Sequence, residues 1–183
     1  MGQVFDFEPE KMIIGVIYND KEVFSEAMRI LTDKFGETDL CCEEFSFSDD
    51  FSTYYDEELG GKGMRRIYSF KTMVDPAKQA EIKEFTNDIE KKFSSEHGRL
   101  INLDPGFINH GRLMLATTKN AGFRIPLKNG IYTELTLFYA RGGWHKFPWS
   151  YRDYQSERVQ NFLTEVRKIY LADRKKLKKG QKI

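Results

Sequence analysis

An apolar run near the start of the chain, MIIGVIY at residues 12–18, constrains the fold more than any other segment. Unbroken apolar runs of this length that are rich in Ile are typical of strands buried on both faces. We therefore predict that residues 12–18 form the first strand and that this strand is central in its sheet. The run is far too short for a membrane-spanning helix, which needs roughly 20 apolar residues.

A helix is predicted directly after this strand. The Asn19-Asp20 pair can cap it, apolar residues then recur at helical spacing, and Gly36 ends the pattern. Residues 38–47 and 64–72 have the composition of strands, and we predict them as the second and third strands of the sheet.

A second helix and a fourth strand complete a familiar order. Asp75 and Pro76 are the expected N-cap acceptor and first-turn proline of the helix. Residues 99–104 alternate as a strand, which we expect to end in an Asp-Pro-Gly turn at residues 104–106. The order βαββαβ is typical of a ferredoxin-like unit, in which two helices pack on one face of an antiparallel sheet.

The C-terminal part adds further elements. Residues 112–118 can be helical or extended. Strand patterns at residues 123–127 and 131–139 flank a Lys-Asn-Gly sequence and predict a hairpin, and residues 156–171 carry the apolar stripe of a final helix. We therefore predict one α+β domain, a ferredoxin-like βαββαβ core with an added C-terminal β-hairpin and α-helix.

The charge is balanced overall but unevenly distributed. The 183 residues include 29 Lys and Arg against 28 Asp and Glu, whereas residues 174–183 hold six bases and no acid. We divide the chain into a mildly acidic domain at residues 1–173 and a basic C-terminal tail at residues 174–183. Such a tail can attract phosphate backbones or anionic surfaces, but the solvated end of a helix is the more ordinary interpretation.

The cysteines and histidines give no sign of a disulfide or a metal. Cys41 and Cys42 are adjacent, so on a strand they point to opposite faces and are expected to be reduced thiols. His97, His110 and His145 stand at no zinc spacing, so we predict no metal site, and no cofactor is identified. Because no signal segment opens the chain, we expect a cytoplasmic protein.

The best candidates for a ligand site lie in a long connection, at the end of the fourth strand and in two later loops. The connection, residues 48–63, exceeds the usual two to five residues of a hairpin loop and includes paired tyrosines and a Gly-Gly-Lys-Gly run that can approach a ligand closely. The candidate ligand-binding residues are Tyr54, Tyr55, Arg66, Asn102, Asp104, Lys119 and Trp149. In this hypothesis basic groups meet an anion, the Asn and Asp hold a polar body, and an aromatic ring from Tyr54 or Trp149 covers a face.

Each of these groups also has a purely structural interpretation. Asp104 can cap its own turn, the tyrosines can pin a surface loop, and Trp149 can fasten the final helix to the sheet. Local residue types do not decide between the two interpretations.

Familiar nucleotide-binding machinery is missing. A phosphate-binding Walker loop fails because Asp56 replaces its first Gly and Gly63 its hydroxyl residue, and a strand pattern follows. Residues 118–121 resemble a guanine-reading loop, but Ala121 lacks the necessary carboxylate. An RNA-recognition fold has the same element order, yet the aromatic platform for base stacking is absent.

Glu134 is the one charge in an otherwise apolar strand pattern and is a candidate general acid or base. If Leu127 pairs with Ile131 in the hairpin, Arg124 falls opposite Glu134, and we prefer such a cross-strand ion pair. A bulge of one residue would cancel this match and leave the glutamate free.

Several blocks together resemble a prokaryotic family catalogued as domain of unknown function 4416. The matching segments are residues 14–20 (IGVIYND), 51–60 (FSTYYDEELG), 75–76, 85–87, 102–106 (NLDPG), 115–120 (LATTKN) and 148–154 (PWSYRDY). The resemblance implies an intracellular, single-domain protein. It brings no established reaction, cofactor or catalytic residue.

The leading hypothesis is a protein that binds a small anionic ligand, nucleotide-like or phosphorylated, without a phosphate-binding Walker loop. The alternative is an RNA- or protein-binding module with no catalytic activity, although the acidic domain disfavours nucleic acid. An obligate oligomer with aromatic loops at its interface is a third hypothesis. Enzymatic activity, catalytic residues and oligomeric state are left open.

Overall fold

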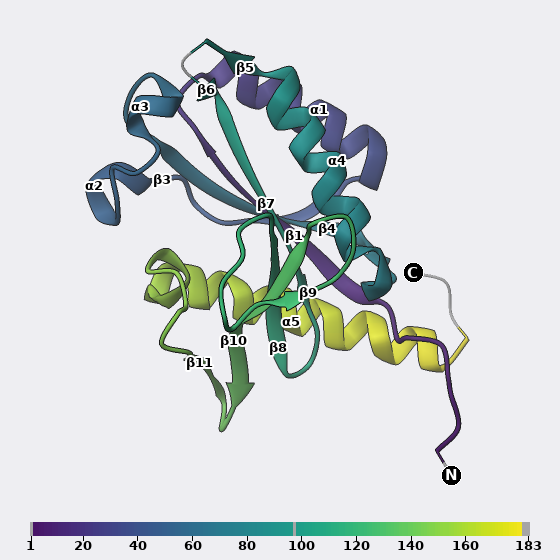
Figure 1. Cartoon of the computed structure of the whole chain (residues 1–183). Coiled ribbons are helices and arrows are strands. Elements are labelled where there is room, and N and C mark those ends of the chain that lie inside the picture. Colours follow the sequence, from purple (N-terminus) through teal and green to yellow (C-terminus); the bar gives the residue numbers. More distant parts are fainter. Residues whose placement is uncertain (1, 97, 181–183) are drawn as a thin grey trace.

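The computed structural model describes residues 2–96 and 98–180, which form an α+β structure around one large antiparallel sheet (Figure 1). Its strands are β1 (Glu10–Tyr18), β2 (Thr38–Cys41), β3 (Phe45–Ser46), β4 (Met64–Val74), β7 (Ile101–Ile108), β8 (Arg112–Thr117), β9 (Ile125–Pro126), β10 (Tyr132–Ala140) and β11 (Gly143–Lys146). Along the main path the order is β11-β10-β8-β7-β1-β4-β2, while β3 pairs with β4 and β9 with β10.

The helices are α1 (Lys21–Phe35), α2 (Phe47–Asp50), α3 (Asp56–Leu59), α4 (Gln79–Lys92) and α5 (Glu157–Lys178), with single 3-10 turns η1 (Pro76–Lys78) and η2 (Asp153–Gln155). A separate two-stranded ladder joins β5 (Ser94–Ser95) to β6 (Gly98–Arg99). Asp20 caps α1 and Asp75 caps η1 through their side chains, because both carboxylates accept from free backbone N–H groups.

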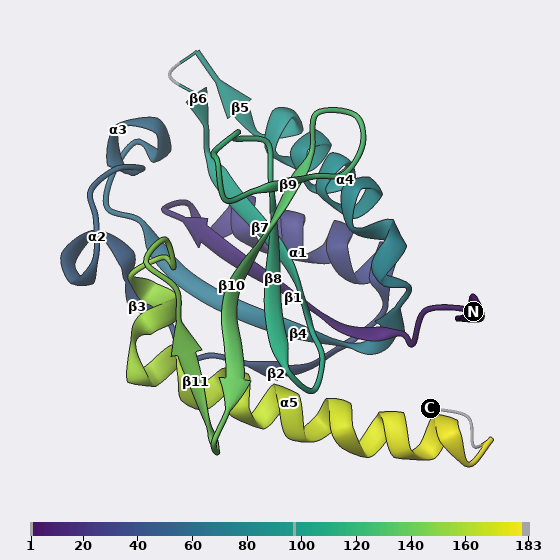
Figure 2. The same ribbon diagram turned by 60° about the horizontal axis from the view of Figure 1, so that its bottom comes forward.

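The prediction of a central first strand is confirmed. β1 pairs with β4 on one side and β7 on the other, and all of its residues are buried. Met12, Ile14 and Val16 point to the face covered by α1 and α4, which we call the helix-pair face. Ile13 and its neighbour Ile67 point to the opposite face, against α5, which we call the single-helix face. Figures 1 and 2 show the helices on these two sides.

The sheet is larger and more continuous than predicted. The segment at residues 112–118 is extended and forms β8, which joins the C-terminal hairpin to the first half of the chain. The predicted strand at residues 38–47 is interrupted, and its two parts both pair with β4. α5 continues to Lys178, so the basic tail begins as helix, in line with the interpretation we preferred.

The predicted turn at residues 104–106 is wrong, because β7 runs straight through Pro105 and Gly106. Gly106 is needed there for close packing, since a Cβ would lie 2.7 Å from the carbonyl oxygen of Met114 on β8. The Pro-Gly pair therefore marks a close contact between strands instead of a chain reversal.

The cysteines are free thiols, with Cys42 buried and Cys41 half-buried. Within residues 2–96 and 98–180, no group of three or more His, Cys, Asp and Glu side chains could hold a metal ion. His97, one of the three histidines considered for a metal, lies outside the described residues. Among the helices in the described part of the chain, none is both long enough and apolar enough to cross a membrane.

Candidate functional site

A cavity of about 510 Å³ lies on the single-helix face, at the end of the sheet where β1 ends and β4 begins. This volume is typical of sites for small molecules. Five basic and two acidic side chains line it, together with six aromatic rings. The charged residues are Arg65, Lys83, Arg99, Lys119, Arg152, Asp104 and Asp153, and the aromatic residues are Phe47, Phe51, Tyr54, Tyr55, Tyr151 and Tyr154.

The cavity opens where β7 and β8 diverge. Among the described residues the two strands pair only between residues 106–108 and 113–115. Backbone N–H groups two residues apart on a strand point to the same edge. The backbone nitrogen of Pro105 therefore points to the same edge of β7 as that of Leu103, but it carries no hydrogen to donate. Pairing with β8 therefore ends at this proline, and the first part of β7 is left with an open edge.

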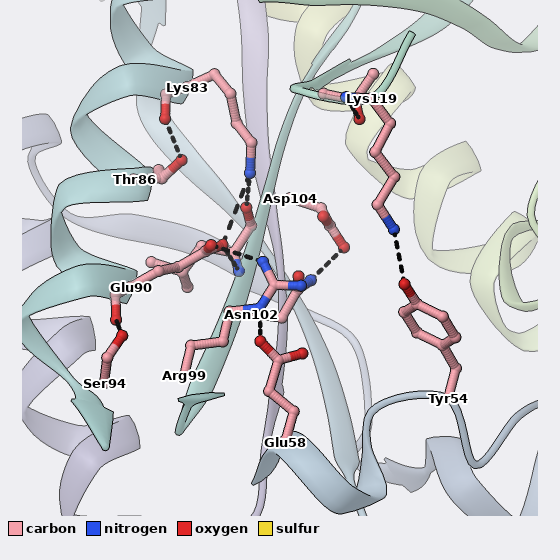
Figure 3. Close-up of polar contacts among 12 residues, drawn as sticks. Tyr54, Glu58, Lys83, Thr86, Glu90, Ser94, Arg99, Asn102, Asp104 and Lys119 are labelled. Atoms are coloured by element: carbon pink, nitrogen blue, oxygen red, sulfur yellow. Dashed lines mark hydrogen bonds and ion pairs between the residues drawn. The ribbon is translucent and has the colours of Figure 1, made fainter. Parts of the chain in front are cut away.

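Helix α4 satisfies that open edge with a Lys–Glu pair (Figure 3). Lys83 Nζ donates to the carbonyl oxygen of Leu103 at 2.7 Å, and the N–H of Leu103 donates to Glu90 Oε1 at 2.7 Å. Lys83 Nζ and Glu90 Oε1 are 3.7 Å apart. Both side chains are buried, so they replace the missing strand partner and close the cavity on the helix side.

Arg65 forms the floor of the cavity, although its guanidinium is only 1% exposed. Nη1 lies 3.0 Å from Asp104 Oδ2, and Nη2 lies 3.1 Å from the Tyr154 hydroxyl and 3.2 Å from Asp153 Oδ2. The guanidinium passes over Gly15, where a Cβ would lie 2.6 Å from Nη2. A glycine in the central strand thus leaves the space in which a buried arginine crosses from β4 to β7.

The two carboxylates around Arg65 differ in their environments. Burial raises the pKa of Asp153, and the Arg65 charge only partly opposes this effect. Burial also acts on Asp104, but Arg65 and Lys83 outweigh it, so the pKa of Asp104 lies below its usual value. The Asp104 side chain is 28% exposed and that of Asp153 is 4% exposed. Asp104 is therefore the ionised carboxylate that the cavity presents.

Two of the basic lining residues, Lys119 and Arg152, are exposed, and we call their side of the cavity its outer end. Lys119 is exposed, and its Nζ lies 3.3 Å from the hydroxyl of Tyr54 and 4.8 Å from the centroid of that ring. Arg152 is exposed too, and no side chain in the described ranges pairs with its guanidinium. Figure 3 shows Lys119 reaching toward Tyr54 from the side opposite α4. These two cations are available to an anion without breaking a buried ion pair.

A buried ion pair holds two walls of the cavity in place. Arg124 Nε lies 2.7 Å from Glu134 Oε2, which confirms the cross-strand pair that the hairpin register predicted. The same guanidinium donates to the Lys119 carbonyl oxygen at 2.7 Å and to the Tyr151 hydroxyl at 3.0 Å. The pair is 9% and 1% exposed, so it is a positioning element for Lys119 and Tyr151 and not a surface contact.

The long connection covers the cavity as two short helices. Arg99 attaches it, because its Nε lies 2.7 Å from Glu58 Oε1 on α3 while its Nη1 donates to Glu90 on α4 at 2.7 Å (Figure 3). The glycine run at residues 60–63 does not line the cavity. Lys62 pairs with Asp49 on α2 at 2.5 Å.

Five of the seven predicted ligand-binding residues come together at this cavity, namely Tyr54, Tyr55, Asn102, Asp104 and Lys119. Arg66 and Trp149 are not among its lining residues. Arg66 lies beside Tyr68 on the helix-pair side of β4, and Trp149 donates its indole N–H to the Leu135 carbonyl oxygen at 2.8 Å within a stack of rings. These contacts join Trp149 to β10 and to neighbouring rings, and none of them involves the final helix.

Four charged residues of the lining, Arg65, Lys83, Arg152 and Asp153, were not among the predicted ligand-binding residues. One signal pointed to Arg65, because Gly15 interrupts the apolar central strand and Asp104 pairs directly with it across the β1–β7 ladder. A small residue opposite a carboxylate in a buried strand indicates space for a large cation. Lys83 gave no such signal, since its neighbours on the helix predict only an amphipathic stripe.

Fold and site together define an α+β domain with an aromatic-walled, predominantly basic cavity beside a divergence in its sheet. Residues 8–170 match the family described as Domain of unknown function (DUF4416), and the chain belongs to that family. No curated protein and no solved structure matches the chain significantly.

Proposed function

We propose that the protein binds a small anionic ligand, nucleotide-like or phosphorylated, in the cavity between α2–α3 and the strands β7 and β8. The observation that carries this proposal is the charge of the lining, in which five basic side chains stand against two acidic ones. Phosphate groups are commonly bound by Arg and Lys side chains of this kind.

The positions of the charges support an anion at the outer end. Arg65, Arg99 and Lys83 already pair with carboxylates of the protein. Lys119 and Arg152 are exposed and hold no carboxylate partner among the described residues. An anion bound between them gains two charge-assisted contacts at little desolvation cost.

The aromatic walls support a ligand with a flat or apolar part. Tyr54 and Tyr55 meet edge to face with ring centroids 4.9 Å apart, and Tyr55 lies beneath the Arg99 guanidinium at 5.6 Å. Burial raises the pKa of Tyr55, so its hydroxyl stays protonated and neutral at physiological pH. Such rings present stacking faces and hydroxyls without adding negative charge.

A thermal-shift screen of nucleotides, sugar phosphates and inorganic anions tests the proposal, because a ligand that binds only the folded protein raises its unfolding temperature. We expect a reproducible shift with at least one phosphorylated class, and a loss of that shift in the double variant Lys119→Gln/Arg152→Gln. Lys21→Gln/Lys91→Gln removes equal charge from exposed positions outside the cavity and serves as the matched control. The absence of any shift across the panel would refute the proposal.

A second candidate function, binding of a protein partner without catalysis, is favoured by a ladder of rings near the β10–β11 edge. Phe147 and Trp149 stack with centroids 5.0 Å apart, Phe123 stacks on Trp149 at 4.8 Å, and Phe138 stacks on His145 at 5.0 Å. Phe123 and Phe138 are both 38% exposed. Light scattering tests its simplest form, self-association, and a mass that remains monomeric at high concentration counts against that form.

We also propose that β1, α1, β2, β4, α4 and β7 make a ferredoxin-like unit. The order β7-β1-β4-β2, the antiparallel pairing and the position of both helices on one face support this assignment. In that description β8, β10 and β11 extend the sheet beyond the unit, and the cavity lies where the extension begins. An experimental structure tests the topology directly.

We further propose that the protein works in the cytoplasm. The free thiols of Cys41 and Cys42 support a reducing compartment. Burial raises the pKa of Cys42 to about 11, so this thiol is a poor nucleophile and suits a packing role. Fractionation of cells that express the tagged protein tests the location.

A further inference from the structure

The inner end of the cavity has a chemistry different from its outer end. Asp104 Oδ2 accepts from Arg65 at 3.0 Å and from Asn102 Nδ2 at 2.8 Å. No described residue donates a hydrogen bond to Oδ1 of the same carboxylate. Since the side chain is 28% exposed and lines the cavity, the carboxylate is fixed through Oδ2 and leaves Oδ1 as the acceptor for a ligand.

The charges around Asp104 select the kind of donor that fits. Arg65 contacts Asp104, and the buried ammonium of Lys83 is near enough to stabilise its charge. A ligand ammonium at Oδ1 would add another cation to these two. A neutral hydroxyl donates the same hydrogen bond without that repulsion, so the geometry favours a hydroxyl over an amine.

The cavity therefore has an acceptor for a hydroxyl, Asp104, at its inner end. At its outer end it has two cations, Lys119 and Arg152, that pair with no carboxylate among the described residues. Tyrosine rings, Thr117 and Thr118 also line the cavity. A plain anion would leave Asp104 Oδ1 without a hydrogen-bond donor. An ester of phosphate with a polyhydroxylated body complements both ends.

We infer that the ligand is a hydroxyl-bearing phosphate ester, a sugar phosphate or a nucleoside phosphate, bound with its phosphate at Lys119 and Arg152 and its hydroxyls at Asp104 Oδ1. This inference rests on the proposed function, because it assigns the substrate class of the same cavity. Asp104 takes the role of a specificity-determining residue. Asn102 is a positioning residue, which holds the carboxylate through Oδ2.

Calorimetric titration with four probes tests the inference. Ribose 5-phosphate carries hydroxyls and phosphate, phenyl phosphate lacks the hydroxyls, and glucosamine 6-phosphate carries an ammonium, to be compared with glucose 6-phosphate. We expect ribose 5-phosphate to bind at least about tenfold tighter than phenyl phosphate, because a site built to hydrogen-bond a hydroxyl rejects the analogue without it. Glucose 6-phosphate should bind tighter than its amino counterpart.

The variant Asp104→Asn identifies the residue responsible. It should reduce the preference for ribose 5-phosphate over phenyl phosphate to about twofold or less. Asp33→Asn, an exposed carboxylate on α1, is the matched control. If Asp104→Asn does not fold, the comparison of probes on the unaltered protein still decides.

The outcomes distinguish a failure of the hydroxyl assignment from a failure of the proposed anion binding. Equal or tighter binding of phenyl phosphate overturns the hydroxyl assignment but leaves an anion site. Tighter binding of glucosamine 6-phosphate than of glucose 6-phosphate overturns it in favour of an ammonium. If no phosphate ester binds, the proposed function itself fails, and the inference fails with it.

Discussion

The two faces of the same sheet have been closed in different ways. On the helix-pair face, α1 and α4 pack against β1, β4 and β7. Together these elements bury a large cluster of apolar side chains, among them Leu31, Ile89 and Phe107. On the single-helix face, α5 covers the sheet with Val159, Leu163 and Val166 but begins only after η2. The connection that carries α2 and α3 covers the remaining end of that face, and there the cavity lies.

The difference teaches where polar groups can enter a buried sheet. β1 supplies Ile14 and Val16 to the dry face and Gly15 to the other, so one strand serves a packed core and a ligand cavity by alternation alone. Where α5 packs on the sheet, the buried ammonium of Lys11 pairs with carboxylates from β2 and from α5. Beyond α5, Arg65 finds carboxylates from β7 and from η2.

The largest expected effect comes from Arg65→Met. It removes the cation between Asp104 and Asp153 and leaves two carboxylates without their common partner, so we expect unfolding to become easier by about 3–5 kcal/mol. Arg66→Met, one residue along β4 and on the other face, is the matched control with an expected change below about 1 kcal/mol. Urea denaturation measures both.

A second substitution sharpens this result. Arg65→Met/Asp153→Asn removes one of the stranded charges and should recover part of the lost stability. If Arg65→Met costs no more than Arg66→Met, the two faces do not differ as described.

Gly15→Ala should have a smaller effect. The added Cβ overlaps the Arg65 guanidinium, and relieving this overlap should cost about 1–3 kcal/mol and displace Arg65 from Asp104. Gly111→Ala is the control, because nothing lies within 4 Å of a Cβ at that position. Equal thermal stability of the two variants would show that β1 does not need a glycine for the arginine.

The dependence of stability on pH should differ between the wild type and Asp104→Asn. The pKa of Asp104 is lowered in the folded protein, so its contribution is present above the ordinary value of 3.8 and is lost as the pH falls through the lower folded pKa. Asp153 has a raised pKa and acts with the opposite sign in the window above 3.8. Denaturation from pH 2 to 6 should show a smaller acid-induced loss in Asp104→Asn, and parallel curves would contradict the assigned pKa of Asp104.

The smallest expected effect concerns the chain ends, outside either face. Glu8 pairs with Arg174 at 2.6 Å and with Lys178 at 2.9 Å, and these contacts lower its pKa to about 2. Because the Glu8 side chain is 49% exposed, solvent screening limits the gain to about 0–1 kcal/mol. Glu8→Gln should therefore change amide exchange near α5's end more than global stability, and a large global loss would contradict the exposed geometry.

Local patterns predicted the elements that depend on local chemistry. The caps at Asp20 and Asp75, the apolar β1 and the register that joins Arg124 to Glu134 all follow from neighbouring residues. The Asn102 and Asp104 corner was recognised as well, because alternation alone places both residues on one face of a strand.

The rest of the site depended on distant packing. Alternation showed that Arg65 and Arg66 point to opposite faces, but only the position of α5, far along the chain, decides which face keeps a cavity. Lys83 lines that cavity because β7 and β8 diverge beside α4. Pro105 predicted a turn, whereas in the structure it marks the end of the β7–β8 pairing. Both failures arise from contacts between segments distant in sequence.

The most direct measurement of the central claim is calorimetric titration of ribose 5-phosphate into the wild type and into Lys119→Gln/Arg152→Gln. We predict saturable binding to the wild type and at least about tenfold weaker binding to the double variant, with the unfolding temperatures of the free proteins within a few degrees. Equal affinity of the two proteins would contradict the account, and so would the absence of binding to the wild type.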